Sequence, residues 1–105
     1  MILVRMEWGN LKMTMEGHAG TAEKGHDLVC AGASMLAQAL GRSLQIAQAR
    51  GRLDLQILSE EGMMRIQADP ELSSLNETKA YFRMFLNGMR MLAEEYPANV
   101  KVKEV

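Results

Sequence analysis

Alternation of apolar and polar side chains around a Gly-Asn pair constrains this chain most strongly. Apolar residues stand at every second position in residues 2–8, and the same period resumes in residues 11–16 after Gly9-Asn10. Because strand side chains point alternately to two faces, this period is typical of a strand with one buried face. A two-residue turn containing Gly or Asn is a strong hairpin signal, since such turns need positive φ. We therefore predict an N-terminal β-hairpin that turns at Gly9-Asn10.

A long amphipathic helix is predicted next. Apolar residues recur at steps of three and four from Val29 to Ala47, which places them on one helix face. Asp27 precedes this run as a suitable N-cap, and the pattern ends near Arg50. Small residues that would let a second helix or a partner subunit approach closely recur beside this face at Ala33, Ala37 and Gly41.

A second hairpin and a second helix are predicted in the remaining sequence. Residues 53–58 and 64–68 alternate again, with the turn sequence Ser59-Glu60-Glu61-Gly62 between them. Ser74-Leu75-Asn76-Glu77 has the Ser-x-x-Glu form of a capping box, which predicts a helix start. The apolar face of this helix continues to Tyr96, and Pro97 ends it.

The C-terminal residues 100–103 alternate valine and lysine, which predicts a charged edge strand. The resulting order is strand-strand-helix-strand-strand-helix-strand. This order favours an α+β fold, a two-layer sandwich in which two helices cover one face of a mainly antiparallel sheet. A length of 105 residues suits a single domain, residues 1–105, with one core.

Charge and hydropathy restrict the partners that we expect. The formal net charge is −1, so the chain lacks the basic field that dominates nucleic-acid affinity. The first residues carry Arg5 and Glu7 and have no signal-peptide pattern, and no apolar run approaches the about 18 residues of a membrane span. We therefore expect a cytoplasmic protein without direct nucleic-acid or membrane partners.

Residues 17–36 contain both histidines and the single cysteine. If Asp27 caps the helix, Cys30 stands at position N3, beside backbone N–H groups and the positive end of the helix dipole. Such surroundings favour a thiolate and can bind an oxyanion. Ser34, one turn later on the same face, either bonds to the Cys30 carbonyl or faces a substrate. The alternative for Cys30 is a small apolar core residue.

Gly17 precedes His18 directly, and Gly20 and Gly25 follow it. A loop that admits a peptide, closes over it and presents an imidazole benefits from residues without Cβ. The alternative is an ordinary connecting loop with a solvated histidine. A thiol at Cys30 with the His18 imidazole in reach is the minimum equipment for covalent catalysis.

A zinc site built from Cys30, His18, His26 and either Asp27 or Glu23 is the competing chemistry. The spacing matches none of the paired Cys or His arrangements that hold structural zinc, and one thiol gives little sulfur ligation. We therefore expect no metal and no other cofactor.

The segments Gly17-His18-Ala19-Gly20 and Gly25-His26-Asp27-Leu28-Val29-Cys30-Ala31, with Ser34, resemble the signature of the ribosomal-processing cysteine protease family called Prp. The resemblance implies a dimeric cytoplasmic endopeptidase whose cysteine and histidine correspond to Cys30 and His18. Its implied substrate is the N-terminal extension of large-subunit ribosomal protein twenty-seven.

The resemblance also implies roles for neighbouring residues. Gly17, Gly20 and Gly25 would act as hinges of a substrate loop, and Asp27 and Ser34 would lie near the site. Substrates of the family carry aromatic residues before the cut, which implies an apolar groove.

Our leading hypothesis is therefore a cysteine endopeptidase in which His18 takes the thiol proton and Cys30 attacks the scissile carbonyl. Helix-start N–H groups and a loop amide would hold the oxyanion. Two alternatives remain at this point. One is a non-catalytic, ribosome-associated or regulatory dimeric interaction module, and the other is a redox or metal sensor built on the lone thiol.

Overall fold

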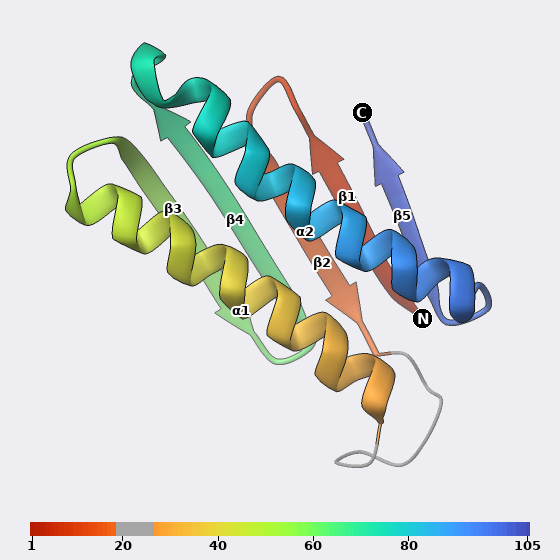
Figure 1. Cartoon of the computed structure of the whole chain (residues 1–105). Helices are drawn as coiled ribbons and strands as arrows, with labels where there is room; N and C mark the ends of the chain where they lie inside the picture. The colour runs from red at the N-terminus through yellow and green to blue at the C-terminus, as the bar shows by residue number, and fades with distance from the viewer. Residues whose placement is uncertain (19–26) are drawn as a thin grey trace.

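A computed structural model describes residues 1–18 and 27–105 of the chain. Its elements in chain order are β1 (Ile2–Glu7), β2 (Lys12–Gly17), α1 (Leu28–Ala49), β3 (Leu53–Glu60), β4 (Met63–Pro70), a 3-10 helix (Leu72–Ser74), α2 (Leu75–Glu95) and β5 (Val100–Glu104). In this part of the chain the strands form a five-stranded sheet in the order β3-β4-β2-β1-β5. Both long helices lie on the same face of the sheet (Figure 1). The predicted two-layer α+β fold is confirmed.

Strand β5 closes one edge of the sheet, as predicted. The pairs β1–β2, β2–β4 and β3–β4 are antiparallel, whereas β5 pairs with β1 in parallel. Its lysines, Lys101 and Lys103, are exposed, which discourages pairing with the edge of another sheet.

The core lies between the sheet and the helices. Its largest fully buried side chains come from both layers and include Met6, Met13, Leu44, Ile66, Phe82, Leu86 and Met89. Methionines fill much of this space because an unbranched thioether adapts to irregular gaps.

The small residues of α1 face the sheet, where they allow the helix to pack closely. Ala33 and Ala37 are buried, and a Cβ at Gly41 would lie 3.7 Å from Ile57 Cδ1. The other helix approaches α1 at a different point, where a Cβ at Gly88 of α2 would lie 2.7 Å from Leu36 Cδ2. A close approach of the two helices is thus seen at Gly88 of α2 and Leu36 of α1.

The first hairpin turns differently from the prediction. Its loop runs from Trp8 to Leu11, and the Leu11 N–H donates to the Trp8 carbonyl at 3.3 Å. The positive φ falls on Leu11, at 45°, and not on Gly9 or Asn10. Because the Leu11 side chain is 4% exposed, its burial offsets the strain of this conformation.

The second hairpin is tighter than predicted. Strand β3 continues to Glu60 and β4 begins at Met63, so the turn is the pair Glu61-Gly62 and not the four residues from Ser59. Gly62 takes a φ of +75°, which suits a residue without Cβ.

The predicted capping box does not form. Ser74 is the N-cap of α2, but its side chain makes no capping hydrogen bond in the described chain, because the preceding 3-10 helix runs directly into α2. The Glu77 carboxylate instead accepts hydrogen bonds from the Tyr81 hydroxyl at 2.6 Å and from Arg52 Nη1 at 3.0 Å. The Tyr81 hydrogen bond is the main cause that lowers the pKa of Glu77.

Glu104 fastens the C-terminal strand to α2 and to the first hairpin. Its Oε1 accepts hydrogen bonds from Trp8 Nε1 at 2.8 Å and from Arg83 Nη1 at 3.0 Å, while Arg90 donates to Oε2. The Arg83 guanidinium also stacks 4.4 Å from the Trp8 ring centroid. The pKa of Glu104 is lowered to about 2, mainly by the hydrogen bond from Arg90 and next by the hydrogen bond from Trp8.

This network predicts a pH-dependent stability. Since the folded-state pKa of Glu104 is depressed, its carboxylate stabilises the fold above pH 4.5, and that contribution is lost as the pH falls toward 2. A quarter of the side chain is exposed, so we expect Glu104→Gln to lower the free energy of unfolding by only about 1 kcal/mol at pH 7. Urea denaturation at pH 7 and pH 3 measures this, with Glu94→Gln on the exposed face of α2 as the control. Equal losses of unfolding free energy in Glu104→Gln and Glu94→Gln would contradict a stabilising role for the Glu104 carboxylate.

Neither α1 nor α2, in the part of the chain that the structure describes, is long and apolar enough to cross a membrane.

Candidate active site

Cys30 and His18 lie in the same cleft. The end of β2, the start of α1 and the β3–β4 turn gather at one end of the molecule (Figure 1). A cleft of about 250 Å³ there is lined by Cys30, His18 and Ser34. The cysteine is half-buried and the histidine is exposed. The structure thus brings together the thiol and the imidazole that the sequence analysis singled out.

The start of α1 positions Cys30. Asp27 is the N-cap, and its Oδ1 accepts hydrogen bonds from the N–H groups of Val29 and Cys30, at 3.0 Å each. Both the predicted cap and the N3 position of Cys30 are confirmed. The first turn therefore directs the cysteine toward the cleft and fixes its backbone.

The same hydrogen bonds correct one expectation about the oxyanion site. The N–H groups of Val29 and Cys30 already donate to the Asp27 carboxylate, so they are not open donors. An ionised carboxylate is a strong acceptor and satisfies helix-start N–H groups well. The N–H of Leu28, at N1, does not bond to this carboxylate.

Gly17 positions the backbone before His18. It takes a φ of +94°, and its N–H donates to the Gly62 carbonyl at 2.8 Å. A Cβ at Gly17 would lie 2.1 Å from the Met1 carbonyl oxygen, so only glycine fits. The His18 carbonyl in turn accepts a hydrogen bond from the Met1 ammonium group. These contacts hold the end of β2 against β1 and the β3–β4 turn.

Gly62 contributes to the site, although the sequence analysis treated it as a turn residue only. A Cβ at Gly62 would lie 3.3 Å from His18 Nε2. The signal that places it in a tight turn is a Glu-Gly pair between two alternating stretches. No pattern in the sequence links that turn to His18.

The other site candidates are placed only in part. Ser34 is exposed, lines the cleft and accepts a hydrogen bond from Gln38 Nε2 at 2.8 Å. Gly20 and Gly25, and the zinc candidates Glu23 and His26, lie outside the described residues. Among residues 1–18 and 27–105, no three His, Cys, Asp or Glu side chains are grouped so that they could hold a metal ion.

The apolar lining of the cleft comes from both layers of the fold. Its members are Ile2 of β1, Met15 of β2, Ala33 of α1, and Met63 and Met64 of β4. The cleft is therefore partly apolar on the side of the sheet and of α1.

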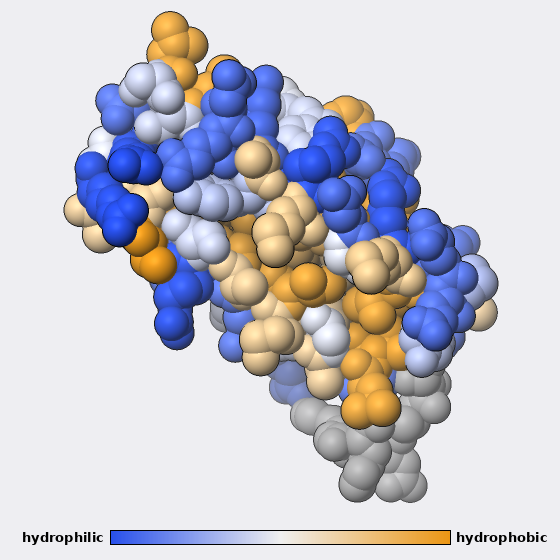
Figure 2. All heavy atoms as spheres, in the orientation of Figure 1, coloured by the Kyte–Doolittle hydropathy of each residue, from blue (hydrophilic) through white to orange (hydrophobic). Residues whose placement is uncertain are grey.

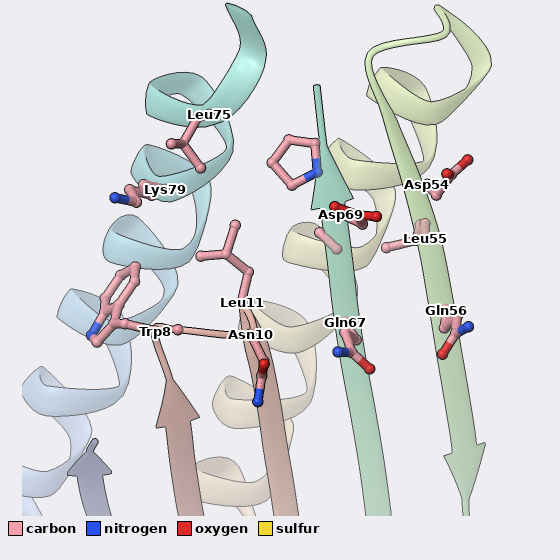
Figure 3. Close-up of a pocket in the computed structure, with 13 residues that line it drawn as sticks. Trp8, Asn10, Leu11, Asp54, Leu55, Gln56, Gln67, Asp69, Leu75 and Lys79 are labelled. Carbon is pink, nitrogen blue, oxygen red and sulfur yellow. The ribbon is translucent and has the colours of Figure 1, made fainter. Parts of the chain in front are cut away.

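A larger cleft, of about 740 Å³, lies at the opposite end of β2 (Figure 3). Trp8, Leu75 and Lys79 lie on one side of it, and Gln67 of β4 and Asp54 of β3 lie on the other (Figure 3). No cysteine or histidine of the described residues lines it. Thiol chemistry therefore belongs to the smaller cleft.

Solved structures with the same fold include peptide complexes. The essential ribosomal processing protease Prp from Staphylococcus aureus, with a covalently linked product peptide, matches with a TM-score of 0.81 and 24% identity over 100% of both chains. Its complex with a substrate peptide matches with a TM-score of 0.74 and 23% identity, again over 100% of both chains. A Streptococcus mutans protein matches with a TM-score of 0.67 and 27% identity, over 99% of this chain and 91% of that one. A comparison with curated proteins finds no match.

The family match is more decisive than the structural similarity. The model of the family described as cysteine protease Prp matches residues 1–101. This match spans β1 through the start of β5, and it includes every residue of the described cleft. The chain therefore belongs to the cysteine protease Prp family, and it is a cysteine protease.

Proposed function

We propose that Cys30 and His18 are the nucleophile and the general base of this protease, within a single catalytic domain formed by residues 1–105. The observation that carries the proposal is a thiol at a helix start that shares a cleft with an imidazole. A thiol needs a nearby base or a lowered pKa to react as a thiolate, and this arrangement supplies the base. Family membership supplies the reaction class.

The reaction proceeds in two halves. His18 accepts the thiol proton, the Cys30 sulfur attacks the scissile carbonyl carbon, and the resulting oxyanion collapses as the peptide C–N bond breaks. His18 gives its proton to the leaving amine. A water molecule then loses a proton to His18 and attacks the thioester, which releases the new carboxyl group and restores the thiol. Both halves use the same imidazole.

The oxyanion needs N–H donors that do not already bind the Asp27 carboxylate. Since Asp27 holds the N–H groups of Val29 and Cys30, the helix-start donor that we assign to the oxyanion is the Leu28 N–H. The capping carboxylate also places a negative charge close to Cys30, which opposes ionisation of the thiol. The His18 imidazole therefore carries more of the activation than the helix dipole does.

The lining of the cleft favours an apolar or aromatic side chain before the cut. Ile2, Met15, Met63 and Met64 offer aliphatic and thioether surface. Thioether sulfurs make favourable contacts with aromatic rings, worth about 0.3–1.5 kcal/mol each. This chemistry supports the aromatic preference that the family resemblance implies.

We propose the N-terminal extension of large-subunit ribosomal protein twenty-seven as the substrate, cleaved in the cytoplasm. The structurally similar Staphylococcus aureus protein is described as a ribosomal processing protease, with substrate and product peptides bound. No metal or other cofactor takes part in the proposed reaction. A non-catalytic interaction module is disfavoured, because the family consists of cysteine proteases.

The test uses the purified chain and the full-length ribosomal protein of the same organism. We expect intact-mass spectrometry to show loss of a short N-terminal segment from the ribosomal protein. The Cys30→Ala protein, incubated in parallel, should leave it uncut. A ribosomal protein that stays at full length with the wild-type enzyme would contradict the substrate assignment.

We also propose that the protein is a homodimer. Exposed methionines Met84 and Met91, with exposed fractions of 76% and 68%, line an apolar cleft of about 370 Å³ between α1 and α2. Figure 2 shows apolar side chains along the centre of this helix face, between hydrophilic flanks. Such a surface is a candidate interface, and sedimentation equilibrium measures whether two copies associate.

A further inference from the structure

The β3–β4 turn reaches the His18 side chain across the cleft. A Cβ built on Gly62 would lie 3.3 Å from His18 Nε2 and 3.9 Å from Cε1. The shorter distance is tighter than ordinary van der Waals contact, so a methyl group at this position would push the imidazole aside. Glycine leaves the ring this space, and any Cβ would require the ring to shift by a few tenths of an ångström.

The same turn holds the main chain that precedes His18. The Gly62 carbonyl accepts a hydrogen bond from the Gly17 N–H at 2.8 Å. This bond extends the β2–β4 ladder, whose last pair is Glu16 and Met63. Gly62 thus binds the backbone before His18 and also lies close to the ring of this exposed histidine.

We infer that Gly62 is a positioning residue for the His18 imidazole, and that the β3–β4 turn sets the orientation in which this base meets the Cys30 thiol. The inference rests on the proposed function of His18. Misplacing a catalytic group by about 1 Å costs up to about 10²-fold in rate. A side chain at Gly62 displaces the ring by less than that, so we expect a loss of about tenfold.

The chain offers a matched control in Gly51. Gly51 takes a φ of +73°, close to the +75° of Gly62, but a Cβ at Gly51 would meet no described atom within 4 Å. Alanine costs similar backbone strain at both positions. The difference between Gly62→Ala and Gly51→Ala therefore isolates the contact with the imidazole.

The experiment measures the rate of Cys30 alkylation by iodoacetamide between pH 5 and pH 9. The chain has one cysteine, so the whole signal comes from Cys30, and no substrate is needed. We expect Gly62→Ala to slow alkylation near neutral pH by about tenfold and to alter its pH profile, because the thiolate forms through His18. Gly51→Ala should follow the wild type. NMR spectra of the His18 imidazole should change in Gly62→Ala only.

Equal rates and pH profiles in Gly62→Ala and Gly51→Ala would overturn the inference. If Gly62→Ala does not fold, Gly62→Asn and Gly51→Asn replace the pair, because asparagine tolerates positive φ and still adds a Cβ.

His18→Ala separates this inference from the proposed function. Slower alkylation in His18→Ala with normal alkylation in Gly62→Ala would reject the positioning role and keep His18 as the base. Unchanged alkylation and cleavage in His18→Ala would reject the proposed function itself.

Discussion

Replacing Cys30 with alanine will abolish peptide cleavage and leave the protein folded. The proposed route forms a thioester, which needs the sulfur atom, and the loss of a nucleophile that acts together with its base costs on the order of 10⁴-fold or more. Cys30 is half-buried and lines a cleft, so we expect the change in unfolding free energy to stay within about 1 kcal/mol. Cleavage of the ribosomal protein and thermal unfolding, measured on the same preparation, test both parts.

Ser34→Ala is the matched control for Cys30→Ala. Ser34 also lies on α1 and lines the same cleft, but it has no step in the proposed reaction. We expect its cleavage rate to stay within about tenfold of the wild type, the scale of a lost substrate contact. Full cleavage activity in Cys30→Ala, or an equal loss in both variants, would rule out Cys30 as the nucleophile.

Replacing Gly17 with alanine will destabilise the fold more than the other glycine substitutions that we describe. The new Cβ would lie 2.1 Å from the Met1 carbonyl oxygen, a backbone atom next to the paired residue Ile2. The φ of +94° adds strain for any residue with a side chain. Strain and overpacking together predict a loss of about 2–5 kcal/mol in the free energy of unfolding. Such a loss is a large fraction of the total stability of a small domain.

Gly9→Ala provides the comparison for Gly17→Ala. Gly9 lies in the first hairpin loop, has no described atom within 4 Å of a built Cβ, and does not take a positive φ. We expect its unfolding free energy to change by no more than about 0.5 kcal/mol. Urea denaturation of both variants measures the difference. Similar midpoints for the two would show that the clash at Gly17 relaxes at little cost.

Local patterns in the sequence predicted most of the fold. Period-two alternation located the strands of both hairpins, and steps of three and four located α1 and α2. The N-cap Asp27 was predictable because a capping carboxylate bonds to N–H groups two and three residues ahead. These features depend on neighbours in the chain, and a sequence displays such neighbours directly.

The errors arose where contacts formed in the folded chain compete with the local signals. Glu77 has the right spacing for a capping box, but Arg52 and Tyr81 take its carboxylate. Gly9-Asn10 suggested a positive φ that falls instead on Leu11, whose side chain is buried in the core. Alternation in residues 100–103 indicated a strand but not its parallel pairing with β1, which depends on where α2 returns the chain.

The sequence likewise revealed some residues of the candidate site and missed others. The resemblance pointed to Cys30 and His18 through motif residues, and both line one cleft. The contact between His18 and Gly62 joins two hairpins, and no periodicity or spacing reveals such a contact. The expectation that helix-start N–H groups would hold the oxyanion overlooked that the N-cap Asp27 already accepts from two of them, those of Val29 and Cys30.

Covalent attack by the Cys30 sulfur is tested most directly by the intact mass of the enzyme during its first turnover. The wild-type protein is mixed with excess ribosomal protein, quenched with acid at successive times, and analysed by mass spectrometry with peptide mapping. The mechanism predicts a transient increase equal to the acyl fragment of the substrate, located on Cys30. Product that accumulates while the mass of the enzyme never changes, at a rate that persists after Cys30 has been alkylated, would contradict it.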